Sequence, residues 1–385
     1  MEKTVVGAYA VPFGWGSAGK LSAIVSASRL LGHDFSWVVF ESGVEQHVLR
    51  SHALLSRPLP SGDRPFESEA NSVDVAVVVL DPGVAQRFLV AGTPTVYVDS
   101  LPFLWTEEDP IPVAADVYCA QLCDSLPAPS WAALRAIRNL HWVQAIVSPE
   151  VERRSQTHKR GAGGRRAVIN FGGLHSPHEW SGYRSYVELV LAPSVEALVA
   201  TGFETIDVCG NVPPQVIGGV HIGARSHHEF LALLADTDVL VTAPGLTTLL
   251  EADALRVPTV CLPPQNLSQV MNGDRFATSI GDSSARMMWP GQVLKLSDVT
   301  AARIRGEDAA LKVIYGAINR AAATMLTSCQ DWLRDQLMRT LPDITRAGAQ
   351  LAPFGARGAY EIASLVAAVA RNADGVPRRA RLTRA

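Results

Sequence analysis

Two patterns of apolar residues alternate along the chain. Short runs that are apolar on both faces and rich in β-branched residues, such as Val73–Leu80, predict strands buried on both sides. Longer segments with apolar residues three and four positions apart, such as 17–31, predict helices that pack on those strands. Strands alternating with helices are typical of a parallel sheet covered on both faces, so the chain is predicted to be an α/β protein.

This alternation occurs twice. The first series predicts strands at 4–11, 37–40, 73–80 and 95–98 and helices at 17–31 and 84–90. The second series predicts strands at 167–171, 205–209, 238–242 and 259–262 and helices at 185–201, 230–235, 247–255 and within 301–341. Proline interrupts the helical hydrogen bonds, so a kink is expected at Pro193. The predicted architecture is two doubly wound, Rossmann-like domains facing each other across a cleft.

Composition changes predict the domain boundaries. The predicted segments are an N-terminal Rossmann-like domain (1–150), a polar, basic, glycine-rich linker (151–165), a C-terminal Rossmann-like domain (166–345), a helix packing back on the first domain (355–372) and a disordered basic tail (373–385). A surface loop is expected at 56–71, where Pro, Ser and Gly are frequent.

Charge and cysteine content narrow the class of partner. The 385 residues carry a formal net charge of −3, which favours small molecules over nucleic acid or an anionic membrane. The five scattered cysteines suit a reducing compartment, and neither a signal peptide nor an apolar run of about 20 residues is found. The expectation is a cytoplasmic protein without a membrane span, a metal or another cofactor. A homodimer is one oligomeric state compatible with the sequence.

A glycine-rich turn follows the first predicted strand and opens the first helix. Its candidate ligand-binding residues are Gly14, Trp15, Gly16, Ser17 and Gly19. Together with Lys20 they match the Gly-x-x-x-x-Gly-Lys part of a phosphate-binding loop, but Leu21 replaces the hydroxyl residue that would hold Mg²⁺. A degenerate P-loop hydrolase, a dinucleotide site and a turn without ligand remain alternatives. A loop at the mouth of the cleft is favoured.

The segment 238–272 is more informative. A strand ends in the turn Gly245, Leu246, Thr247 and Thr248, which begins a helix whose free amides can cradle a diphosphate. Glu251 lies one turn further along, where its carboxylate can accept hydrogen bonds from a ribose diol. Gln265 and Gln269 follow the next strand and can donate to phosphate or sugar hydroxyls at the same edge.

This segment resembles the donor-binding signature of GT-B glycosyltransferases, the group that includes the UDP-sugar enzyme of lipid II synthesis. The resemblance implies a UDP-sugar donor, with its diphosphate on the Gly-Thr turn, its ribose on the helical glutamate and its sugar near the glutamines. It also implies that uracil is read near Ser226, His227, His228 and Glu229, and that Gly172 and Gly173 face the phosphates. In the lipid II enzyme a histidine follows the glycine loop. Lys20 stands there in this chain and suits an anion, either a phosphate or a sugar carboxylate.

Two further segments, Phe13–Leu21 and Asp99–Trp105, are similar to cytosylglucuronate synthases of peptidyl-nucleoside antibiotic biosynthesis. This narrower resemblance implies transfer of glucuronate from UDP-glucuronate to cytosine or hydroxymethylcytosine. Asp99 ends a strand at the presumed cleft edge and is the predicted catalytic base. The predicted partners of a flat acceptor are Trp15, Phe103 and Trp105, and those of the sugar carboxylate are Lys20 first and Arg184 second.

The predicted activity is therefore metal-independent glycosyl transfer by one in-line displacement, which inverts the anomeric centre. The alternatives are a GT-B enzyme for another natural-product or lipid-linked acceptor, a UDP-sugar epimerase, a P-loop-like nucleotide hydrolase and a non-catalytic sensor of nucleotide-sugars.

Overall fold

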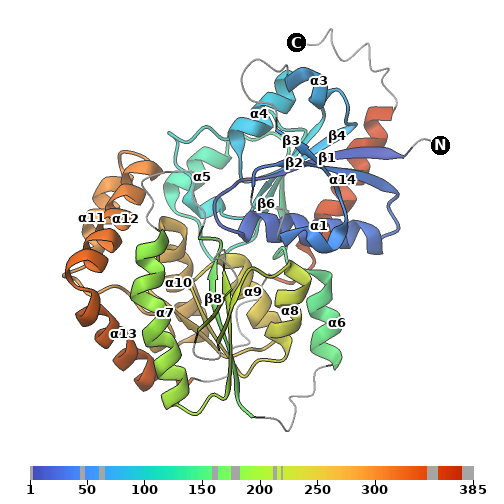
Figure 1. Ribbon diagram of the computed structural model, residues 1–385. Helices are drawn as coiled ribbons and strands as arrows, with labels where there is room; N and C mark the ends of the chain where they lie inside the picture. The colour runs from blue at the N-terminus through green and yellow to red at the C-terminus, as the bar shows by residue number, and fades with distance from the viewer. Residues whose placement is uncertain are drawn as a thin grey trace. The chain divides into compact units, whose positions relative to one another are not determined.

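The computed structural model describes residues 3–43, 48–59, 66–157, 164–174, 183–210, 215–217, 220–344 and 354–374. The chain divides into two compact units, each with its own sheet and covering helices (Figure 1). The first unit combines Met1–Pro149 with the C-terminal segment Phe354–Ala385. The second unit is Glu150–Pro353.

The first unit is built on a seven-stranded parallel sheet in the order β3-β2-β1-β4-β5-β6-β7. Its strands are β1 (Thr4–Ala10), β2 (Phe35–Glu41), β3 (Leu55–Pro58), β4 (Val75–Val79), β5 (Thr95–Asp99), β6 (Val117–Gln121) and β7 (Leu140–Val143). Its helices are α1 (Gly16–Leu30), α3 (Phe66–Ala70), α4 (Pro82–Val90), α5 (Ala128–Leu134) and α14 (Gly358–Asp374), with short 3₁₀ turns η1 (Arg50–His52) and η2 (Pro102–Leu104). All residues of the central strand β4 are buried, as its uninterrupted apolar sequence requires.

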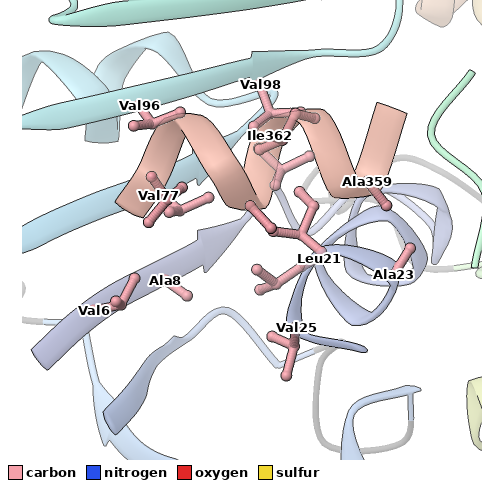
Figure 2. Close-up of a cluster of buried hydrophobic side chains, with 14 of the residues drawn as sticks. Val6, Ala8, Leu21, Ala23, Val25, Val77, Val96, Val98, Ala359 and Ile362 are labelled. Atoms are coloured by element: carbon pink, nitrogen blue, oxygen red, sulfur yellow. The ribbon is translucent and has the colours of Figure 1, made fainter. Parts of the chain in front are cut away.

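One face of this sheet is covered by two helices from opposite ends of the chain. Helix α14 packs beside α1 and against strands β4 to β7 (Figure 2). Its buried residues recur at helical spacing and are Ala359, Ile362, Ala363, Val366 and Ala370. The opposite face carries a second apolar cluster to which α3, α4 and α5 contribute. The core of the first unit is therefore completed only by the C-terminal helix.

The second unit contains a six-stranded sheet in the order β10-β11-β9-β8-β12-β13. Its strands are β8 (Arg166–Gly172), β9 (Thr205–Gly210), β10 (Gln215–Ile217), β11 (Val220–Gly223), β12 (Val239–Thr242) and β13 (Thr259–Cys261), all parallel to their neighbours except β10. Its helices are α6 (Pro149–Thr157), α7 (Tyr183–Ala200), α8 (His227–Ala235), α9 (Leu246–Ala254), α10 (Leu267–Ile280), α11 (Leu296–Arg303), α12 (Glu307–Thr324) and α13 (Leu326–Thr340), with the 3₁₀ turn η3 (Ser283–Ala285).

Strand order reverses once in each sheet. In the first sheet the chain winds outward from β1 toward β2 on one side and continues from β4 on the other. In the second sheet β8 and β12 occupy the equivalent central positions. Doubly wound sheets bind ligands outside the carboxyl ends of their strands at this reversal, so each unit has one edge at which a site is expected.

The predicted α/β class and doubly wound sheets are confirmed, with corrections to individual segments. The predicted linker 151–165 begins in a helix, because α6 extends to Thr157. The predicted surface loop 56–71 contains the end of β3 and all of α3. Helix α7 continues through Pro193 as one element, without a break. The tail from residue 375 lies outside the described residues.

Within the part of the chain that the structure describes, no helix combines the length and hydropathy needed to cross a membrane.

Candidate functional site

A buried amide links three segments that meet at the reversal point of the second sheet. Asn170 near the end of β8 places its Nδ2 atom 3.2 Å from the hydroxyl oxygens of both Thr242 and Thr248. Its Oδ1 atom accepts a hydrogen bond of 3.0 Å from the backbone N–H of Gly172. This joins the end of β8, the end of β12 and the first turn of α9.

Helix α9 begins at this edge with a glycine cap. Gly245 has no side chain to occupy the first amides of the helix. The neighbouring helices differ: α8 has a complete capping box formed by Ser226 and Glu229, and α10 is capped by the Asn266 side chain. Uncapped amides and the helix dipole favour an anion, so the N-terminus of α9 is the helix end at this edge best suited to a phosphate.

Gly172 makes the turn that faces this helix end. Its φ of 65° lies in the left-handed region, and an added Cβ atom would meet nothing within 4 Å. Glycine is therefore required by the backbone conformation and not by crowding. Gly172 and Gly173 are both half-buried.

Glu251 is not a free carboxylate in this structure. Its Oε1 atom lies 2.7 Å from Nε2 of His227, the first residue of α8, and the two side chains are almost completely buried. The pair joins α9 to α8 one turn beyond the N-terminus of α9. His227 engages Oε1, which leaves Oε2 as the other carboxylate oxygen, and only 1% of Glu251 is exposed. His227 was predicted to lie near uracil, and its link to the glutamate was not anticipated.

The other residues predicted near uracil have partners of their own. The Glu229 side chain accepts a hydrogen bond from the backbone N–H of Ser226 and completes the cap of α8. His228 is exposed, and its Nδ1 atom lies 2.7 Å from Oε2 of Glu150. Partial burial raises the pKa of Glu150, but the nearby His228, Arg154 and His227 outweigh this and hold the pKa below its ordinary value.

Gln265 and Gln269 brace the loop that follows β13. The Gln265 side chain donates a hydrogen bond of 3.2 Å to the backbone carbonyl of Phe171, and its backbone N–H donates to Oε1 of Gln269 at 2.9 Å. Both side chains are buried. The structure thus brings the two glutamines to the same sheet edge as Gly172, where they order the loop.

The glycine-rich segment of the first unit is mostly helical. Helix α1 begins at Gly16, so the predicted turn is confined to Gly14 and Trp15, and Ser17 and Gly19 already belong to the helix. Gly14 adopts a φ of 68°. The Ser17 hydroxyl donates to the Val11 carbonyl at 2.7 Å, which closes the loop on itself.

Lys20 points into the first unit. Only 1% of the residue is exposed, and its ammonium donates to Gln121 Oε1 at 2.9 Å and to the Ile146 carbonyl at 3.0 Å. These bonds join α1 to the end of β6 and to the segment after β7. The arrangement differs from a phosphate-binding loop, in which the lysine extends toward the ligand. Arg184, the second cation predicted for the sugar carboxylate, is exposed in the first turn of α7.

Asp99 is fully buried and accepts three hydrogen bonds. The donors are the backbone N–H of Leu101 at 2.9 Å, the indole Nε1 of Trp105 at 2.7 Å and the hydroxyl of Tyr118 at 2.8 Å. Burial raises the pKa of Asp99 to about 6, although these hydrogen bonds oppose the shift. Phe103 is also buried, so in this segment the aromatic side chain that is partly accessible is Trp105.

Several residues of these arrangements were missed from the sequence, among them Asn170, Tyr118 and Gln121. Asn170 had a detectable signal, because it is the polar residue inside the apolar run that precedes Gly172. Tyr118 and Gln121 lie on β6, which was not predicted. Among the described residues, no cluster of His, Cys, Asp and Glu side chains is arranged to hold a metal ion.

No protein-family model matches the chain, and no curated protein matches it by sequence. Solved structures resemble it at low identity. A protein described as a UDP-N-acetylglucosamine 2-epimerase of Listeria monocytogenes is 13% identical, with a TM-score of 0.46 over 98% of both chains. MurG of Acinetobacter baumannii is 13% identical, with a TM-score of 0.45 over 95% of this chain and 100% of that one. UGT2 of Phytolacca americana, solved with UDP-2-fluoro-glucose and pterostilbene, is 13% identical, with a TM-score of 0.47 over 96% of this chain and 100% of that one.

Proposed function

We infer that the chain is a GT-B glycosyltransferase whose second unit binds a UDP-sugar. One observation carries this proposal: the glycine-capped end of α9, the Thr248 hydroxyl and the Gly172 turn meet at the reversal point of the second sheet, tied together by Asn170. A doubly wound sheet binds its ligand at this position, and a helix N-terminus flanked by hydroxyl and backbone donors suits an anion. A diphosphate is the anion that the donor signature in the sequence implies.

The proposed reaction is a single displacement at the anomeric carbon of the sugar. A nucleophilic atom of the acceptor forms a bond to that carbon while the bond to the diphosphate oxygen breaks. UDP departs with the electron pair, and a base takes the proton of the acceptor. Negative charge therefore grows on the diphosphate, where amides and a helix dipole equivalent to about half a positive charge are already oriented. This is why we propose transfer without a metal ion.

Glu251 is proposed to bind the ribose diol with the oxygen that His227 does not engage. The pair is buried between α8 and α9, so the carboxylate is fixed before the ligand arrives. A carboxylate already oriented binds a diol at a smaller cost in side-chain entropy than a mobile one. Uracil is proposed to lie near residues 226–229 at the start of α8.

The narrower proposal is transfer of glucuronate from UDP-glucuronate to cytosine or hydroxymethylcytosine. It is supported by the resemblance of the 13–21 and 99–105 segments, and it assigns the acceptor to the first unit. Trp105 is partly accessible and is the proposed stacking surface for a flat base.

The first unit offers two roles for Asp99. As a base it has a suitable pKa of about 6, near the pH at which an enzyme in neutral solution works. Its geometry favours the other role, because a fully buried carboxylate with three donors anchors the Leu101–Trp105 segment. A sugar carboxylate would likewise reach Lys20 only by replacing Gln121 or Ile146.

The first experiment is a thermal-shift and calorimetric panel of UDP, UDP-glucuronate, UDP-GlcNAc, GDP and ATP. We expect stabilisation by the uridine nucleotides, and turnover of UDP-glucuronate with cytosine in the presence of EDTA. Glu251→Ala should weaken UDP binding by about tenfold, since it removes a charged hydrogen-bond partner of the ribose. Deoxy-UDP serves as the control: if Glu251 binds the diol, the variant loses less affinity for it than for UDP.

The same panel distinguishes the proposed donor from the alternatives. Stabilisation by ATP with Mg²⁺ but not by any uridine nucleotide would contradict the donor assignment. Product analysis separates a transferase, which releases UDP and a glycosylated acceptor, from an epimerase, which returns an altered UDP-sugar without an acceptor.

A further inference from the structure

Asn170 occupies an unusual place for a primary amide. It is the fifth residue of β8, only 4% of it is exposed, and both neighbours in sequence are apolar. A buried amide costs free energy unless its polar atoms are hydrogen-bonded, so its contacts show what it is there to hold.

The contacts fix which way the amide faces. A backbone N–H can only donate, so the atom of Asn170 that faces the Gly172 N–H must be the carbonyl oxygen. The NH₂ group therefore faces the two threonines. The NH₂ group donates one hydrogen bond to the hydroxyl oxygen of Thr242 and one to that of Thr248.

This orientation determines where the Thr248 hydroxyl can point. Because its oxygen accepts from Asn170, its own hydrogen is directed elsewhere. A helical threonine usually donates to the carbonyl four residues earlier, as Thr278 does to Asp274. For Thr248 that carbonyl belongs to Pro244, and it accepts a hydrogen bond from Asn272. No residue in the described ranges accepts the Thr248 hydrogen, so this donor remains available at the N-terminal turn of α9.

We propose that Asn170 is a positioning residue that holds the Thr248 hydroxyl as a hydrogen-bond donor toward a bound diphosphate. The same amide ties the Gly172 turn to α9, so the two sides of the anion site keep a fixed spacing. The inference rests on the proposed function for the identity of the nucleotide. Asn170 itself does not touch the ligand in this scheme and acts through Thr248.

The test is a double-mutant cycle with Asn170→Ala and Thr248→Val, measured as the affinities for UDP and for uridine. Each single variant should weaken UDP binding by about tenfold, the worth of one hydrogen bond to a charged group. The double variant should bind UDP at most about twofold more weakly than whichever single variant binds it less well, because both substitutions remove the same interaction. Uridine affinity should be equal in all four proteins. Additive losses, or equal losses for uridine, would overturn the proposal.

Asn170→Asp separates positioning from a structural role. It keeps an oxygen for the Gly172 N–H but replaces the NH₂ group with an acceptor, which draws the Thr248 hydrogen away from the ligand. We expect UDP affinity to fall at least as far as in Asn170→Ala, with a smaller loss of thermal stability. Binding equal to that of the wild type would overturn the proposal. If Asn170→Ala does not fold, Asn170→Asp and Thr248→Val form the cycle instead, and Thr278→Val is the matched control for loss of a helical hydroxyl.

Failure of this inference can be told apart from failure of the proposed function. If the wild type binds inorganic pyrophosphate or ADP but not UDP, the uridine assignment is wrong, and the same cycle is measured with pyrophosphate. If the wild type binds none of these anions, both the proposed function and the role of Asn170 are wrong.

Discussion

The two sheets reverse strand order in the same way, yet their polar residues at that edge are arranged differently. In the first unit the Ser17 hydroxyl donates to its own loop, and Lys20 is buried against Gln121 and Ile146. In the second unit the Thr248 hydroxyl accepts a hydrogen bond from Asn170, and we propose that its own hydrogen points to a bound ligand. A glycine-rich turn before a helix is thus insufficient to identify a ligand site. The direction in which the first polar side chains donate is more informative.

The largest effect expected from this comparison lies at Asp99. Its pKa is about 6 in the folded protein, above the ordinary 3.8, so the folded state binds the proton more tightly than the unfolded state. The contribution of Asp99 to the free energy of unfolding should therefore be fully present below about pH 4 and be lost between about pH 4 and 6. The loss is about 3 kcal/mol, at about 1.4 kcal/mol per pKa unit. Asn at this position cannot ionise, so Asp99→Asn should remove this part of the pH dependence.

The measurement is denaturant unfolding of both proteins from pH 4 to 7, compared as a difference so that other carboxyl groups cancel. A parallel kinetic measurement separates the two proposed roles of Asp99. Loss of kcat with unchanged stability at pH 7 would identify a base, whereas loss of stability with altered Trp105 fluorescence would identify an anchor.

Lys20→Met should cost about 2 kcal/mol of stability, because the Ile146 carbonyl loses its buried donor. Its affinity for UDP should stay within twofold of the wild type, since the proposed function places the nucleotide on the second unit. Calorimetry with UDP checks this. A tenfold loss of UDP affinity would indicate that Lys20 contacts the nucleotide, and the two sheet edges would then no longer differ in this respect.

Gly245→Asp should have opposite effects on stability and on UDP binding at the carboxyl edge of the second sheet. Gly245 has ordinary extended dihedral angles, and an added Cβ atom would meet only the Ala243 carbonyl, at 4.0 Å. An aspartate cap should stabilise α9 by a few tenths of a kcal/mol, up to about 1, while competing with the ligand for the same amides. We expect a higher melting temperature and at least about tenfold weaker UDP binding. Gly245→Ala, which adds no cap, is the control; unchanged UDP affinity in the aspartate variant would contradict the site.

The smallest effect is expected for Gly172→Ala. Its φ of 65° disfavours any residue with a Cβ atom, but the space around it is open. The cost should be about 1 kcal/mol of stability, with little change in the melting of the first unit. A loss above about 3 kcal/mol would show crowding that the structure does not contain.

Sequence periodicity was sufficient for the class of fold because strands such as β4 are continuously apolar and helices such as α1 follow at regular spacing. It missed β6 and β7, because β6 is five residues long and ends in a buried glutamine, and β7 is four residues long with one buried residue. It also placed α6 in a linker, because charged residues on a solvent-exposed helix resemble those of a polar connection.

For the candidate site, the sequence predicted which residues lie at the carboxyl edge of the second sheet but not what they contact. Gly245 and Thr248 could be named from the turn before α9. The pairing of Glu251 with His227 could not, because it joins residues from different helices whose approach depends on packing. The same reason explains why Lys20 was expected to face a ligand: its partner Gln121 is 101 positions away in the chain.

Helix α14 has a consequence for how the protein is made. The first unit needs Ala359, Ile362 and Val366 to close one face of its sheet, and these residues are synthesised after the whole second unit. Domains usually fold in the order in which they leave the ribosome. Here the second unit is fully synthesised before α14, so one apolar face of the N-terminal sheet stays uncovered until α14 has been made. Nascent chains arrested before residue 358 should accordingly depend on chaperones.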